Sequence, residues 1–309
     1  MPAWASDFLF RTEPIVWVQQ FFGYGHPLPF RLVDLLATNW GVVLVAGLAL
    51  WLWGREDVYA LAGVVLAEAV VNVLLNLVID VPRPSGPEIV KYEHVNLGSF
   101  PSGHVFTATV LWGLLWARGR VPLWLSALVV AAVGVGRMYL GVHYLTDVVG
   151  GALLGTLLIW LFRRAWPAAR AWLGERSQGF FLAAGALGIA ATVAGLLLVF
   201  ERSPFLWNSA GVAVGGTVAL LAEHRLVGYE PAWRGAAGAA ARVAVGLLGL
   251  VPLLVVEKRT GEEALALGAV LLALGALWAL LAVPALFRWW GWSRGEERAV
   301  RAVPRPASA

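Results

Sequence analysis

Three polar clusters interrupt an otherwise apolar chain, and their residue types are those used in phosphate chemistry. A guanidinium group grips phosphate oxygens two at a time, and an imidazole can attack phosphorus or protonate a leaving group. The clusters are Arg83-Pro84, Pro101-Ser102-Gly103-His104, and Arg137 followed by His143 and Asp147. Together they predict a site that holds a phosphate, attacks it with one histidine and protonates the leaving group with another.

The segment Pro101-Ser102-Gly103-His104 directly precedes an apolar stretch expected to be helical. Serine is a favoured N-cap, and the unpaired N–H groups at a helix start bind anions. Ser102 and Gly103 therefore predict a phosphate cradle with His104 beside it. Taken alone, the same four residues are also typical of an ordinary capped helix start.

His143 and Asp147 are four residues apart at the start of another apolar segment, so they share one face of a helix. A carboxylate beside an imidazole fixes its tautomer and leaves the other nitrogen free to attack. Arg137 ends the preceding apolar segment, across a tight loop. The alternative for this cluster is a snorkelling arginine and a helix-capping His–Asp pair at a membrane interface.

Glu68, Asn72 and Asn76 recur every four residues along one helical face, deep in an apolar run. Ionisable groups inside a membrane are costly and usually face the interior of a helix bundle. The favoured interpretation of Glu68 is therefore an interhelical hydrogen-bond partner, with a place in a polar pocket as the alternative.

The remaining histidines and the lack of cysteine argue against a metal centre. His26, His94 and His224 are scattered without ligand spacing, and no HExxH or paired-carboxylate motif occurs. With no cysteine in the chain, disulfides and thiolate sites are excluded. We predict neither a metal nor any other cofactor.

Composition places the chain in a membrane. Of its 309 residues, 60% are hydrophobic and only 14% are charged, against about 25% in typical soluble domains. The 17 tryptophans fit this class, since Trp gathers at membrane–water interfaces. The net charge of +4 does not indicate nucleic-acid binding, because the basic residues cluster at the ends of apolar segments.

The expected fold is an all-α integral membrane protein with about nine transmembrane helices, a five-span core followed by four extra C-terminal spans. The predicted spans are 36–54, 58–80, 104–118, 122–140, 143–162, 179–200, 207–226, 238–256 and 264–287. The predicted parts are an interfacial amphipathic segment (1–32), a membrane core (33–165), a basic linker (166–178), a four-span region (179–292) and a cytoplasmic tail (293–309).

Charge indicates the orientation of these spans. With residue 1 outside and nine alternating spans, 15 of the 23 lysines and arginines fall on the inside and eight on the outside. The positive-inside rule then predicts a multi-pass protein of the plasma (inner) membrane with an exterior N-terminus and a cytoplasmic C-terminus. All three polar clusters lie on the outer, or periplasmic, face in this arrangement.

The chain resembles the type 2 phosphatidic acid phosphatase superfamily, which also includes vanadium haloperoxidases. The family signature is Lys, six residues, Arg-Pro; then Pro-Ser-Gly-His; then Ser-Arg, five residues, His, three residues, Asp. Arg83-Pro84, the Pro101–His104 segment, and Arg137 with His143 and Asp147 match it. The resemblance covers about residues 30–165, the front five spans, and its combined pattern is highly specific.

The resemblance implies a role for each matched residue. His143 would be the nucleophile that forms a phosphohistidine, Asp147 would orient it, and His104 would protonate the leaving group and then activate water. The phosphate would be held, without a metal, by Arg83, Ser102, Gly103 and Arg137, with Asn76 as a weaker neighbour.

Two positions depart from the family pattern. Asn76 stands in place of the family lysine, and Gly136 in place of the serine before Arg137. Losing the lysine removes one positive charge from the phosphate site. Lys91, in the loop before the second motif, is the candidate to replace it.

Members of this family act on lipid phosphates, so the expected partners are a phospholipid or polyprenyl phosphate substrate and the surrounding membrane lipids. Phosphatidic acid, phosphatidylglycerophosphate and undecaprenyl pyrophosphate are examples, and an outward site suits the last of these. One alternative is a phosphotransferase that passes the phosphate to a lipid or sugar acceptor. An alternative from another class is a non-catalytic transporter or scaffold.

Overall fold

The computed structural model describes residues 10–79, 81–93, 95, 98–198, 204–232, 234–260 and 264–293, and every regular element in these ranges is a helix. The chain forms two compact units. Unit 1 comprises Met1–Val42 and Ala60–Ala171, and unit 2 comprises Val43–Tyr59 and Trp172–Ala309. The three polar clusters all belong to unit 1, which is therefore the unit that carries the candidate site.

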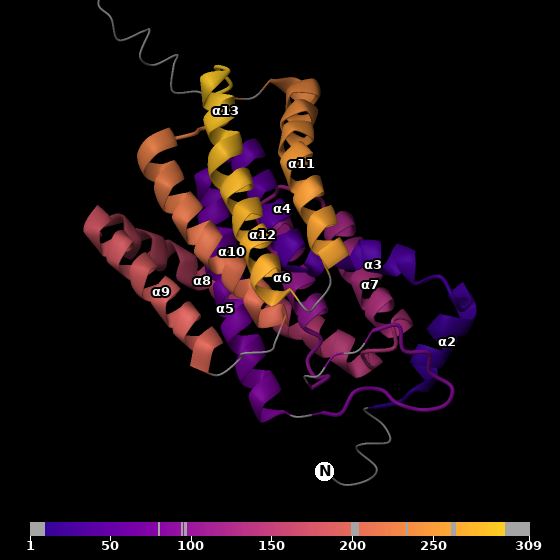
Figure 1. Cartoon of the computed structure of the whole chain (residues 1–309). Helices are drawn as coiled ribbons and strands as arrows, with labels where there is room; N and C mark the ends of the chain where they lie inside the picture. The colour runs from indigo at the N-terminus through magenta and orange to yellow at the C-terminus, as the bar shows by residue number, and fades with distance from the viewer. Residues whose placement is uncertain are drawn as a thin grey trace, which may run out of the picture. The chain divides into compact units, whose positions relative to one another are not determined.

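The helices follow one another along the chain, and a long connection from Val78 to Gly103 joins α5 to α6 (Figure 1). Unit 1 contains α2 (Glu13–Phe22), α3 (Pro27–Asp34), η1 (Leu35–Ala37), most of α5 (Arg55–Val78), α6 (Gly103–Ala117), α7 (Leu123–Tyr139) and most of α8 (Leu145–Gly174). Unit 2 contains most of α4 (Asn39–Leu52), then α9 (Gln178–Leu198), α10 (Pro204–Ala222), η2 (Glu223–Val227), α11 (Gly235–Thr260), α12 (Leu265–Leu277), η3 (Trp278–Ala282) and α13 (Val283–Trp289).

Five described helices are long and apolar enough to cross a membrane, and a sixth is added if the bent pair Pro27–Ala37 and Asn39–Leu52 counts as one span. The five are Arg55–Leu75, Leu145–Gly174, Leu206–Val227, Gly235–Arg259 and Leu265–Trp289. Shorter apolar helices cover Gly103–Ala117, Leu123–Tyr139 and Phe180–Ala191. The prediction of an all-helical, multi-pass membrane protein is confirmed, whereas the count of nine spans stays a prediction.

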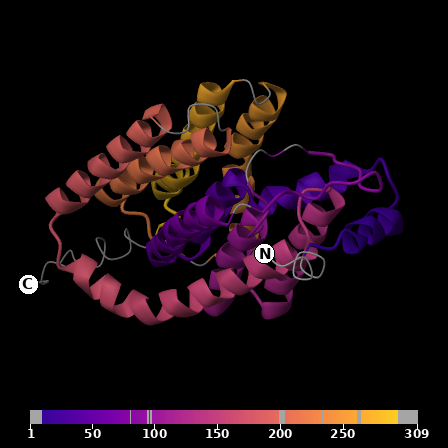
Figure 2. The same cartoon turned by 90° about the horizontal axis from the view of Figure 1, so that it is seen from below.

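Glycines let α6 and α8 approach each other closely. A Cβ on Gly155 would lie 2.6 Å from Cβ of Thr109, and one on Gly151 would lie 2.7 Å from the Ser102 carbonyl oxygen. Figure 2 shows α8 as one continuous, curved helix. Because Gly151 and Gly155 have no side chain, the first half of α8 lies directly against α6. The first turn of α6 carries Gly103 and His104, and the first turn of α8 carries Asp147.

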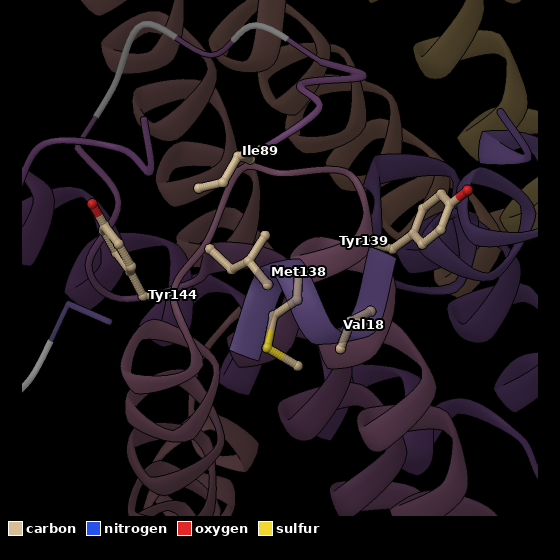
Figure 3. Close-up of a cluster of buried hydrophobic side chains, with 6 residues drawn as sticks. Val18, Ile89, Met138, Tyr139 and Tyr144 are labelled. Atoms are coloured by element: carbon tan, nitrogen blue, oxygen red, sulfur yellow. The ribbon is translucent and has the colours of Figure 1, made fainter. Parts of the chain in front are cut away.

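A small apolar cluster joins α2 to the end of α7 (Figure 3). Its buried members are Ile15, Val18, Ile89, Met138, Tyr139 and Tyr144. Trp17 and Phe21, on the other face of α2, are 62% and 67% exposed, as expected for an interfacial helix. Within the predicted segment 1–32, residues 1–9 lie outside the described ranges, as do residues 294–309 of the predicted tail.

The buried Gln19 side chain fastens the loop between α5 and α6 to this cluster. Its amide nitrogen donates to the Val90 carbonyl at 2.7 Å and to the Tyr139 carbonyl at 2.8 Å. Its oxygen accepts the Val90 N–H at 3.1 Å. The side chain thus pairs with both backbone groups of Val90, much as a neighbouring strand would. The loop that carries Arg83 is therefore held against the end of α7.

Unit 2 has its own buried carboxylate, Glu223, in the π-helical turn η2. Arg55 Nε donates to Glu223 Oε2 at 2.9 Å, and the Tyr229 N–H donates to Oε1 at 2.7 Å. A buried charge with a charged partner and a backbone donor is well compensated. Glu223 therefore has a structural role within unit 2.

Candidate active site

The start of α8 positions both His143 and Asp147. Asp147 lies in the first turn, and its Oδ2 accepts the Tyr144 N–H at 2.8 Å, which satisfies a donor that the helix start leaves unpaired. This contact brings Oδ2 to 3.4 Å from His143 Nδ1. The separation is within ion-pair range but longer than a formed hydrogen bond, as is common for catalytic pairs without substrate. Both side chains are buried.

Arg83 lies on the other side of the His143 ring. Its Nη1 donates to the Val142 carbonyl at 2.9 Å, and its Nη2 donates to the Gly98 carbonyl at 3.0 Å. The same Nη1 lies 3.2 Å from His143 Nε2. Arginine has only donors, so Nε2 is the acceptor of this contact and the ring proton belongs on Nδ1, facing Asp147. In this tautomer Nε2 is unprotonated, and its electron pair points toward Arg83.

The surroundings keep His143 neutral. Burial is the largest cause that lowers its pKa well below 6.5, and the positive charges of Arg137, Arg83 and His104 lower it further. Burial, followed by the charge of Arg137, also lowers the pKa of Arg83 to about 10. Arg83 therefore remains a cation at neutral pH while His143 does not.

Ser102 and Gly103 form the start of α6. Ser102 is the N-cap residue, but its side chain makes no capping hydrogen bond, and its buried hydroxyl has no hydrogen-bond partner among the described residues. Its N–H donates to the Asp147 carbonyl at 3.1 Å, which ties the two helix starts together. A Cβ on Gly103 would lie 2.8 Å from Nδ2 of Asn72, so a larger residue here would displace that side-chain amide.

His104 and Arg137 meet at a carboxylate that sequence reasoning missed. Asp34 Oδ2, at the end of α3, lies 2.7 Å from Arg137 Nη1 and 3.3 Å from His104 Nε2. A second carboxylate, Glu93, lies 3.1 Å from the same Arg137 atom. The available signal was weak: Asp34 is a lone acid between apolar residues just before a predicted span, and Glu93 is a loop residue.

The remaining predicted residues are placed as follows. Glu68 accepts a hydrogen bond from Thr107 Oγ1 at 3.3 Å, so it is an interhelical partner of α6. Lys91 is exposed, and its role as a substitute for the family lysine stays a prediction. Asn76 belongs to α5, but its side chain lies outside what the structure describes. Its assignment to the phosphate site likewise stays a prediction.

The arrangement contains two linked groups of contacts. In one, Arg83, His143 and Asp147 lie in a row, and in the other, Asp34 bridges His104 and Arg137. The charges of Arg137 and His104 act on His143, and Ser102 joins the helices that carry His104 and Asp147. Chemically, the cluster supplies a neutral imidazole with an unprotonated Nε2, a second imidazole paired with a carboxylate, and two guanidinium groups.

Comparison with known proteins assigns a family to this arrangement. The family model described as the PAP2 superfamily matches residues 57–171. Phosphatidylglycerophosphatase B of Bacillus subtilis (strain 168) is 34% identical over 88 residues, 25% of this chain and 43% of that protein. Undecaprenyl-diphosphatase BcrC of the same strain is 31% identical over 123 residues, 38% of this chain and 64% of that protein.

A longer match is to YbjG of Escherichia coli (strain K12), which is 31% identical over 163 residues, 48% of this chain and 78% of that protein. The chain spans about half the length of several other curated relatives that it matches. The matched residues include all three polar clusters of unit 1. The chain therefore belongs to the PAP2 superfamily.

Proposed function

We propose that this protein is a membrane lipid phosphatase that works through a phosphohistidine at His143. The observation that carries the proposal is the row formed by Arg83, His143 and Asp147, in which Nε2 lies 3.2 Å from a guanidinium nitrogen that can only donate. A phosphate oxygen bound to Arg83 would bring phosphorus next to that nitrogen. Positioning and charge neutralisation supply most of what phosphoryl transfer needs.

The first step forms a bond between His143 Nε2 and phosphorus and breaks the bond from phosphorus to the leaving oxygen. His104 gives its proton to that oxygen, and Asp147 stabilises the charge that develops on the His143 ring. In the second step, His104 takes a proton from water, and the water oxygen displaces His143 from phosphorus. Inorganic phosphate is released, and both histidines return to their starting states.

The phosphate oxygens would be held by the cations and by the start of α6. Arg83, Arg137, the Ser102 hydroxyl and the Gly103 N–H are the proposed donors, with Asn76 as a weaker neighbour. The buried Ser102 hydroxyl supports this assignment, because it makes no hydrogen bond to the described residues.

A lipid phosphate or pyrophosphate is the proposed substrate. Relatives named as a phosphatidylglycerophosphatase and an undecaprenyl-diphosphatase support this class. Within this substrate class, the predicted outward orientation of the site favours a polyprenyl pyrophosphate. The test is phosphate release by the detergent-solubilised protein from a panel of both lipid types with EDTA present. No release from any lipid, or strict dependence on added divalent metal, would refute the proposal.

The activity of the protein should persist at acidic pH. His143 attacks only when it is unprotonated, and because its pKa is lowered below 6.5, it remains unprotonated below the range where a free imidazole gains its proton. The acid limb of kcat/KM, corrected for ionisation of the substrate, should therefore lie below pH 6.5. An Arg137→Gln variant should move this limb upward, and an acid limb above 6.5 in the parent would contradict the assignment.

Asp34→Asn should lower kcat by about 10- to 100-fold, since a hydrogen bond to a charged group contributes about 1.5 to 3 kcal/mol. The alkaline limb of the pH profile should move to lower pH, because the His104 imidazolium loses its carboxylate partner. KM should not rise, because the loss of the Asp34 charge leaves the positive charge of Arg137 more available to bind phosphate.

The matched control is Glu93→Gln, which also removes a carboxylate from Arg137 but leaves the contact between Asp34 and His104 intact. It should leave the alkaline limb in place. Equal shifts of that limb in both variants would show that Asp34 acts only through Arg137.

A further inference from the structure

A cavity lies between the last turn of α6 and the second half of α8, away from the helix starts that carry the candidate active site. It has a volume of about 280 Å³ and is lined by Leu114, Ala117, Arg118, Phe162, Arg163 and Trp166. Every lining residue belongs to unit 1. The volume falls just below the range of pockets for drug-sized ligands, which suits a small polar group rather than a whole lipid.

The position of the cavity follows from the length of the two helices. Arg118 comes 14 residues after His104, and Arg163 comes 16 residues after Asp147. At 1.5 Å per residue these separations are about 21 Å and 24 Å along the helix axes. The hydrocarbon core of a bilayer is about 30 Å thick. With the active site near one membrane surface, the cavity therefore lies near the opposite surface.

The packing of the helices supports this geometry. At Gly113, the last glycine contact before the cavity, a Cβ would lie only 2.6 Å from Cδ1 of Ile159. The residues that line the cavity follow this contact along both helices. Phe162 and Trp166 stack at 5.1 Å between ring centroids, and a Cβ on Gly63 of α5 would lie 3.2 Å from the Phe162 ring. One wall is thus aromatic and fixed by packing.

The lining combines two guanidinium groups with apolar and aromatic side chains. Arg163 is exposed, while Arg118 and Trp166 are half-buried. Two arginines in one lining suit a phosphate, and a tryptophan beside them is typical of the headgroup level of a membrane. Basic pockets between transmembrane helices bind anionic lipid headgroups. Leu114 and Phe162 offer apolar contact to the first part of an acyl chain.

We propose that this cavity is a second, non-catalytic site that binds the phosphate headgroup of an anionic phospholipid in the leaflet opposite the active site. A neutral zwitterionic lipid would be bound less well, because its ammonium group opposes the charge of Arg118 and Arg163. Occupancy would link α6 to α8 at the end where their glycine contacts stop.

The test is native mass spectrometry of the full chain in detergent, with phosphatidylglycerol as the probe and phosphatidylcholine of the same acyl chains as the comparison. The parent should retain one phosphatidylglycerol in preference to phosphatidylcholine. Arg163→Gln, at an exposed position, should weaken this binding by about tenfold, and the double variant with Arg118→Gln should weaken it more.

Two further variants serve as controls. Arg164 stacks on Trp160 at 4.1 Å and is not part of the lining, so Arg164→Gln should bind as the parent does. Arg83→Gln alters the candidate active site and should also leave the binding unchanged. Equal retention of both lipids, or equal losses in the Arg163 and Arg164 variants, would overturn the proposal. Loss in Arg83→Gln would place the lipid in the active site, and displacement by inorganic phosphate alone would show a site for free anions.

Discussion

The replacement His143→Ala should reduce phosphate release by at least about 10³-fold, since loss of a covalent nucleophile removes the principal route of the reaction. Nε2 of this ring lies 3.2 Å from Arg83 Nη1, beside the proposed position of the phosphate. Rapid acid quenching with a radiolabelled substrate should trap a labelled phosphoprotein in the parent and none in the variant. Unchanged release from the variant would eliminate the covalent route.

The control for this variant is His224→Ala. His224 is exposed in unit 2, and its Nδ1 lies 3.4 Å from the Tyr59 hydroxyl, far along the chain from the polar clusters. Its removal should leave turnover unchanged. Because His143 is buried beside two cations, gel filtration and circular dichroism should confirm that His143→Ala keeps its fold. Asp147→Asn should lose less activity than His143→Ala, since it removes the orienting group and keeps the nucleophile.

The variant His104→Ala should lose about 10²- to 10⁴-fold in turnover of a lipid phosphate, the usual contribution of a general acid–base group. The loss should be smaller for an aryl phosphate, whose leaving oxygen needs no added proton. With that substrate the phosphoprotein should accumulate, because water is no longer activated in the second step. Equal losses for both substrates, without accumulation, would show that His104 does not transfer protons.

The local part of the site could be predicted from the sequence, because its residues are close along the chain. His143 and Asp147 are only four residues apart and do meet, but the predicted shared helix face is wrong for His143, since α8 begins at Leu145 and only Asp147 lies in its first turn. Asp34 could not be found in this way. It is 103 residues from Arg137, and their contact depends on how α3 packs against α7. No periodic pattern encodes such a meeting of distant segments.

The number of spans was harder to predict for a related reason. The sequence predicted one span over 36–54, but the structure has α3 and η1 before α4, with a bend of 53° between Pro27–Ala37 and Asn39–Leu52. Helices α6 and α7 contain 15 and 17 residues, which is short for a crossing. Composition identifies apolar segments, whereas the bends and the true lengths depend on tertiary contacts.

The hydrogen bonds between Gln19 and Val90 have a consequence for the shortest fragment of this protein that we expect to be active. The family match begins at residue 57, so both Gln19 and Asp34 precede it. A fragment trimmed to the matched segment would keep every signature residue yet release the Arg83 loop and leave His104 without its carboxylate. We expect this fragment to release no phosphate, and a longer fragment that includes α2 and α3 to regain the activity.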